Sequence, residues 1–91
     1  MRQLFLKIHG DVHGVGFRYR TQEKAQELGL VGWVKNAYDD TVEITAEGED
    51  EALKKFVEWC KNGPRWARVT KVEEKWEEIT KNNFNDFKII F

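Results

Sequence analysis

The chain has 91 residues, of which 34% are charged and 41% hydrophobic, and its formal net charge is −1 at pH 7. This length predicts a single domain, 1–91, and the balanced charge argues against a general nucleic-acid binder, which needs an excess of basic residues. The only cysteine, Cys60, excludes an internal disulfide framework and any Cys-x-x-Cys metal or redox motif. No apolar run is long enough for a membrane span or a signal peptide, so we expect a cytoplasmic protein without membrane association.

The charge is unevenly distributed along the chain. Residues 1–36 carry six basic and three acidic side chains, whereas residues 37–91 carry nine basic and thirteen acidic ones. The first segment therefore has a net charge of +3 and the second of −4. This asymmetry reflects either chance or an anion site in the first third, where the excess suffices for one phosphate but not for a polyanion.

The first half of the chain predicts a strand, a helix and a β-hairpin. Residues 3–9 alternate in polarity as in a half-buried strand, and a helix is expected over 17–28 after a glycine-spaced loop. Residues 31–37 and 41–47 predict two further strands, joined by a tight turn at 38–40.

The second half predicts an amphipathic helix over 50–61, a long strand over 68–77 and a last strand over 86–91. Strict alternation along the long strand puts Val69 on the opposite face from Val72. The resulting order, β-α-β-β-α-β plus a C-terminal strand, predicts a ferredoxin-like α+β sandwich with two helices on one face of a mostly antiparallel sheet. That fold hosts many activities, so function must be argued from a site.

The segment Gly10–Arg18, GDVHGVGFR, joins the first predicted strand to the first helix. Backbone N–H groups converge at such a helix N-terminus, and Gly14 and Gly16 permit the backbone angles of an anion-binding nest. Arg18 adds a planar, permanently charged fork. The alternative is an ordinary strand-to-helix turn with a solvated arginine. The Walker pattern is absent, and Tyr19 stands where a dinucleotide-binding loop needs its third glycine.

A second segment, Gly32–Asn36, GWVKN, ends a predicted strand with an amide side chain. In a ferredoxin-like sheet the third strand lies between the first and the second, so Asn36 can reach the loop that follows the first strand. The alternative is an asparagine that opens a hairpin turn, which is a common role for this residue.

Together, Gly10–Arg18 and Gly32–Asn36 resemble the two motifs of the acylphosphatase family, Gly-x-Val-x-Gly-Val-Gly-Phe-Arg and Gly-Trp-Val-Lys/Arg-Asn. The resemblance covers nearly the whole chain and includes Val42 and Gly48.

Two positions depart from the family pattern. Asp40 replaces a turn glycine, and because aspartate tolerates the left-handed region we expect the hairpin to form. His13 replaces a frequent glutamine, and we expect its side chain to face solvent, because such a nest uses the backbone. The alternative for His13 is a role as a phosphohistidine or a base. His9 and Cys60 are expected to be structural.

The resemblance implies hydrolysis of acyl phosphates to a carboxylate and inorganic phosphate, without a metal ion or cofactor. Arg18 and Asn36 would be catalytic: Arg18 would hold the phosphoryl group and Asn36 would orient the attacking water. The 12–18 loop would bind the phosphate through the backbone N–H groups of His13, Gly14, Val15, Gly16, Phe17 and Arg18. We expect a monomer whose partners are a small-molecule acyl phosphate and inorganic phosphate, and not nucleic acid. The terminal carboxylate of Phe91 is a candidate anchor for Arg18.

Three other functions of this fold were considered. An RNA-recognition domain needs exposed aromatic residues on its third strand, and residues 41–47 contain none. A copper chaperone needs two loop cysteines, which are missing. A non-catalytic phosphate-binding or regulatory module remains the alternative to an enzyme, although binding alone would not require the amide of Asn36.

Overall fold

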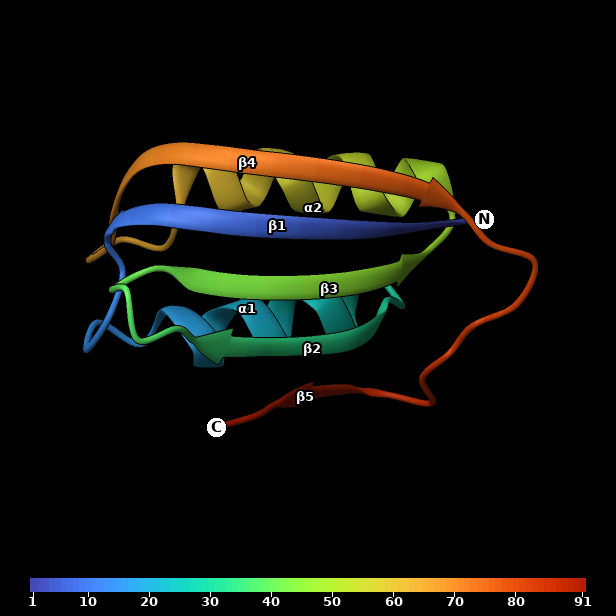
Figure 1. Cartoon of the computed structure of the whole chain (residues 1–91), viewed down its shortest axis with the longest axis horizontal. Coiled ribbons are helices and arrows are strands. Elements are labelled where there is room, and N and C mark those ends of the chain that lie inside the picture. Colours follow the sequence, from blue (N-terminus) through green and yellow to red (C-terminus); the bar gives the residue numbers. More distant parts are fainter.

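The computed structural model describes residues 1–91 as two helices packed on one face of a five-stranded sheet (Figure 1). The elements are, in chain order, β1 (Arg2–Asp11), α1 (Phe17–Glu27), β2 (Val31–Asn36), β3 (Val42–Gly48), α2 (Asp50–Asn62), β4 (Arg68–Glu78) and β5 (Phe87–Ile89). Every predicted element is present near its expected position, and the predicted ferredoxin-like α+β sandwich is confirmed.

The strands lie side by side in the order β4-β1-β3-β2-β5. All neighbours are antiparallel except β2 and β5, which are parallel. Because β1 and β2 both run antiparallel to the β3 strand between them, they end at the same edge of the sheet. Helix α1 also begins at this edge, so the two sequence motifs meet there, at the left of Figure 1.

The core lies between the sheet and the helices. In β1, Leu4, Leu6 and Ile8 are fully buried, whereas the residues between them point to the other face and are partly exposed. Helix α2 adds one apolar stripe, which consists of Leu53, Phe56, Val57 and Cys60. Burial of each large apolar side chain contributes about 1.5–3 kcal/mol to stability. Neither helix is long and apolar enough to cross a membrane.

The alternation predicted for β4 is wrong at one point. The register of β4 against β1 shifts between His9 and Gly10, which leaves Thr70 without a cross-strand partner. Such a bulge changes the face on which the following side chains lie. Val69 therefore packs against the core, as Val72 does, instead of pointing away from it.

The β2–β3 hairpin contains the substitution that departs from the family pattern. Asp40 has φ +70°, and it is the only residue other than glycine with a positive φ. Aspartate is one of the few side chains that adopt this left-handed conformation readily. The prediction that Asp40 would support the turn is confirmed.

Candidate active site

The loop between β1 and α1 exposes a series of backbone donors. Gly14 and Gly16 have φ +71° and +77°, and no atom beyond the glycine and its two chain neighbours lies within 4 Å of the position that a Cβ would take at either residue. No backbone N–H from residue 12 to residue 16 donates a hydrogen bond within the protein. The first bond of α1 runs from the Arg20 N–H to the Gly16 carbonyl at 3.0 Å, so the N–H groups before Arg20 at the helix start are also unpaired.

This arrangement suits an anion. Unpaired N–H groups at a helix start carry the positive end of the helix dipole, equivalent to roughly half an elementary charge. The buried side chains of Val12 and Phe17, each 1% exposed, hold the two ends of the loop in the core while the backbone between them faces outward. The loop therefore has the geometry of a preformed phosphate nest.

Arg18 lies in the first turn of α1 and carries a charge without an acidic partner. None of the nine ion pairs in the structure includes Arg18. Its guanidinium carbon lies 5.2 Å from the centroid of the Phe91 ring, within the range of a cation–π contact. The expected ion pair with the terminal carboxylate is not formed, and the ring of the same residue contacts Arg18 instead.

Asn36 is the last residue of β2 and lies at the same edge of the sheet as the 12–18 loop. Asn36 and Ile8 both pair with Val42, from opposite sides of β3. Because side chains alternate along a strand, Asn36 shares the helix-covered face with the fully buried Val34. The Oδ1 atom of Asn36 is buried and has no hydrogen-bond partner. A buried acceptor without a partner is rare in proteins and often marks a functional position.

The end of β5 lies beside the end of β2. The Ile90 N–H donates to the Val34 carbonyl at 2.9 Å, which continues the parallel pairing beyond Ile89. Phe91 follows at the level of Asn36, so β5 brings the aromatic contact of Arg18 to the edge where Asn36 lies. The sequence predicted that Phe91 contacts Arg18, but through its terminal carboxylate instead of its ring.

The side chain of His13 does not face solvent as expected. It is half-buried, and its Nε2 lies 2.7 Å from the carbonyl oxygen of Thr41, 28 residues away in the chain. The expectation was wrong because the start of β3 lies next to the loop and offers a backbone acceptor. The backbone N–H of His13 is unpaired, as the phosphate-binding prediction requires.

His9 and Cys60 make structural contacts, as expected. His9 lies 2.6 Å from Glu73, and this hydrogen bond lowers the pKa of the glutamate below its usual value. Cys60 is fully buried in the core, and burial raises the pKa of its thiol far above the ordinary value. A thiol in this state is inert as a nucleophile.

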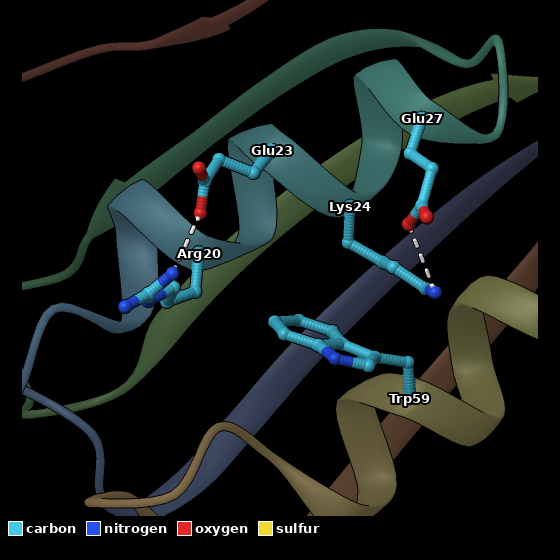
Figure 2. Close-up of a pocket in the computed structure, with 5 residues that line it drawn as sticks. All are labelled: Arg20, Glu23, Lys24, Glu27 and Trp59. Atoms are coloured by element: carbon cyan, nitrogen blue, oxygen red, sulfur yellow. Dashed lines mark hydrogen bonds and ion pairs between the residues drawn. The ribbon is translucent and has the colours of Figure 1, made fainter.

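A groove lies between the two helices (Figure 2). Its volume is about 390 Å³, and it is lined by Arg20, Glu23, Lys24, Glu27 and Trp59. Each basic side chain is paired with an acidic one on the same helix, Arg20 with Glu23 at 3.1 Å and Lys24 with Glu27 at 3.0 Å. With its charges neutralised in this way, the groove does not have the character of an anion site.

Comparisons with known proteins agree with the sequence motifs and the fold. The acylphosphatase family model matches residues 4–89. The chain belongs to the acylphosphatase family. It is 46% identical over 88 residues to an acylphosphatase from Caldanaerobacter subterraneus subsp. tengcongensis, with 97% of each chain covered. It is 45% identical to one from Thermococcus kodakarensis, with 93% of this chain and 91% of the other covered. The crystal structure of acylphosphatase from Bacillus subtilis matches with a TM-score of 0.94 and 41% identity, and both chains are covered completely.

Membership of the family and the local geometry concern the same part of the molecule. The two motif segments that first indicated the family, Gly10–Arg18 and Gly32–Asn36, are the segments that β1, α1 and β2 bring to one edge. Two features of this edge were missed in the sequence: the contact made by the imidazole of His13 and the carbonyl of Thr41 that accepts it. No local pattern could have revealed them, because each depends on residues that are distant in the chain.

Proposed function

We propose that this chain hydrolyses the carboxyl–phosphate bond of acyl phosphates and releases a carboxylate and inorganic phosphate. The observation that carries the proposal is the run of unpaired backbone N–H groups at the start of α1, beside an arginine without an acidic partner. The sequence similarity to acylphosphatases supports the same reaction.

In this proposal the 12–18 loop binds the phosphoryl group of the substrate. The backbone N–H groups of residues 13–18 donate to its oxygens, and the Arg18 guanidinium contacts two of them as a planar fork. Negative charge accumulates on these oxygens during phosphoryl transfer, so donors that are already oriented stabilise the transition state without reorganisation. Their positions on a helix start and a core-anchored loop supply this orientation.

Asn36 orients the attacking water in the proposed mechanism. Its unpartnered Oδ1 accepts a hydrogen bond from the water, which leaves a lone pair of the water oxygen free to point at phosphorus. Holding the two reactants in this geometry replaces a bimolecular encounter by an effectively unimolecular step.

The chemistry needs no acid catalyst because the leaving group is a carboxylate. The conjugate acid of a carboxylate has a pKa of about 4, so the group departs at neutral pH without protonation. The proton of the water passes to a phosphate oxygen, and a dedicated base is not required. We therefore propose that neither a metal ion nor a cofactor takes part, and that positioning and charge stabilisation account for the rate.

The partners, oligomeric state and location of the protein are also part of the proposal. The partners are a small-molecule acyl phosphate and its product phosphate, and the net charge of −1 does not favour nucleic acid. A monomeric, cytoplasmic enzyme remains a prediction from the sequence, and light scattering after size-exclusion chromatography tests the oligomeric state.

Incubation with benzoyl phosphate in the presence of EDTA tests the proposed reaction. We expect benzoyl phosphate to disappear with release of one phosphate per molecule, and added inorganic phosphate to inhibit competitively. If phosphate binds but benzoyl phosphate is lost no faster than in buffer, the chain is a phosphate-binding module and the proposed reaction is wrong.

A further inference from the structure

The imidazole of His13 makes the only side-chain hydrogen bond from the 12–16 part of the loop to another element of the fold. Its Nε2 lies 2.7 Å from the carbonyl oxygen of Thr41, the residue that immediately precedes β3. Because a carbonyl oxygen only accepts, the proton of this bond is on Nε2. The bond therefore ties the backbone donors of the loop to the start of the central strand.

The same carbonyl oxygen accepts a second hydrogen bond, from the N–H of Ala37 at 2.8 Å. Ala37 directly follows Asn36, whose side-chain oxygen is buried and unpartnered. One oxygen atom thus links the segment that presents the N–H groups to the segment that presents the amide. The distance between these two groups depends on Thr41.

Thr41 is itself held firmly. It is 4% exposed, and the Asp39 carboxylate accepts hydrogen bonds from its hydroxyl at 2.5 Å and from its N–H at 3.3 Å. The ammonium group of Lys7 on β1 lies 2.9 Å from the other oxygen of Asp39. The carbonyl of Thr41 is therefore a stable reference point between β1, the hairpin and the loop.

We infer that His13 is a positioning residue that sets the distance between the loop-bound phosphoryl group and the water held by Asn36. This inference rests on the proposed function. Nucleophile and phosphorus must approach to about 3–3.5 Å in line, and a displacement of 1 Å costs about 10²-fold in rate. The internal conformation of the loop depends on Gly14 and Gly16, so the contact made by His13 governs where the loop lies more than whether it binds phosphate.

Three variants test this inference with benzoyl phosphate as substrate and inorganic phosphate as the binding probe. In His13→Ala we expect kcat to fall about 10- to 100-fold, while the inhibition constant of phosphate changes less than about threefold. In His13→Gln the amide can donate to the same carbonyl, and we expect kcat to recover to within about threefold of the wild type. His9→Ala is the matched control, since His9 also makes a short side-chain hydrogen bond near this end of β1, and it should leave both quantities unchanged.

A measurement without turnover separates this inference from the proposed reaction. In ¹H–¹⁵N spectra, addition of inorganic phosphate should shift the Ala37 amide signal in the wild type and in His13→Gln, but much less in His13→Ala. A wild-type protein that shows this linkage but does not hydrolyse benzoyl phosphate contradicts the proposed reaction alone.

Three results would overturn the inference itself: wild-type kcat in His13→Ala, an equal loss of kcat and phosphate binding, or no recovery in His13→Gln. An Ala37 signal that responds to phosphate equally in wild type and His13→Ala would also overturn it.

Discussion

Two side chains with buried polar atoms, Asn36 and Glu47, lie at opposite ends of the sheet and differ in how their hydrogen-bonding capacity is met. At one end, the Oδ1 atom of Asn36 has no partner. At the other, the fully buried carboxylate of Glu47 accepts three hydrogen bonds, from the Gln3 side chain at 2.7 Å and from the Asn83 backbone and side chain at 2.5 and 2.7 Å. Glu47 pairs with Val31, which lies five residues before Asn36 on β2, so the two side chains are roughly 17 Å apart along the strands.

The difference is consistent with a structural role for the Glu47 end of the sheet and with the proposed catalytic role for the Asn36 end. Glu47 lies on the sheet face away from the helices and holds the segment between β4 and β5 against the sheet, so its partners are all supplied by the protein. Asn36 leaves an acceptor unused at a cost to stability, which is typical of a group whose partner is a ligand or a reactant. The unpaired N–H groups and the unpaired Arg18 charge lie at the same end.

The largest effect is expected at Arg18, the arginine proposed to bind the phosphoryl group. Arg18→Ala removes the only charged side chain of the 12–18 loop, which forms no ion pair with an acidic residue. We expect kcat/KM for benzoyl phosphate to fall about 10³- to 10⁵-fold. Phosphate inhibition should weaken as well, whereas the free energy of unfolding should change by less than about 0.5 kcal/mol, because no ion pair is lost.

Arg20→Ala is the matched control for this variant. Arg20 lies on the same helix but pairs with Glu23 at 3.1 Å, so its removal should leave activity near the wild-type value. Activity within tenfold of the wild type in Arg18→Ala would show that the Arg18 guanidinium is not part of the catalytic machinery.

Asn36→Ala should separate catalysis from binding and from stability. Loss of the water-orienting acceptor should lower kcat by about 10²- to 10³-fold, with little change in the phosphate inhibition constant. Because the variant also removes a buried atom without a partner, we expect the unfolding free energy to stay constant or rise slightly. Urea unfolding and steady-state kinetics measure the two quantities, and a large loss of stability would show that Asn36 is structural in the way Glu47 is.

Glu47→Gln should give the reverse result. Both carboxylate oxygens of Glu47 accept hydrogen bonds. In the glutamine variant an NH₂ group replaces one of these oxygens, so two hydrogen-bond donors face each other and one hydrogen bond is lost. We expect the free energy of unfolding to fall by about 1–3 kcal/mol in urea titrations, while kcat stays within about twofold. A marked loss of kcat in a folded variant would contradict the division between the two ends of the sheet.

The sequence predicted the residues of the candidate site better than the tertiary contacts that surround them. The motif segments Gly10–Arg18 and Gly32–Asn36 are local patterns, and strand order brings them together once the fold is known. The bulge near Thr70 was missed, because it arises from pairing with another strand and its only mark in the sequence is Gly10, a glycine inside the first strand.

The partners of two side chains were misjudged for a related reason. His13 was expected in solvent and Arg18 against a carboxylate, but the carbonyl of Thr41 and the ring of Phe91 are their neighbours. The sequence predicted Phe91 as the neighbour of Arg18, but which group of Phe91 makes the contact depends on packing. The contact of His13 with Thr41 also depends on packing, because the two residues lie far apart in the chain. Asp40 was predicted correctly, because a turn depends on the local preference of its residues.

The smallest effect is expected in the turn that supports Thr41. Hydrogen bonds from Thr41, followed by the ion pair with Lys7, hold the pKa of the Asp39 carboxyl far below its ordinary value of 3.8. A lowered pKa in the folded state means that the charged form stabilises folding at pH values above the ordinary one, and that this contribution is lost as the pH falls below it. Asp39→Asn removes the charge at every pH. The difference in unfolding free energy between wild type and variant should therefore be largest above about pH 5 and shrink steadily toward pH 2 in urea titrations. A difference that stays constant over this range would mean that the hydrogen bonds alone hold the turn, and that the ionised form of Asp39 adds nothing to the support of Thr41.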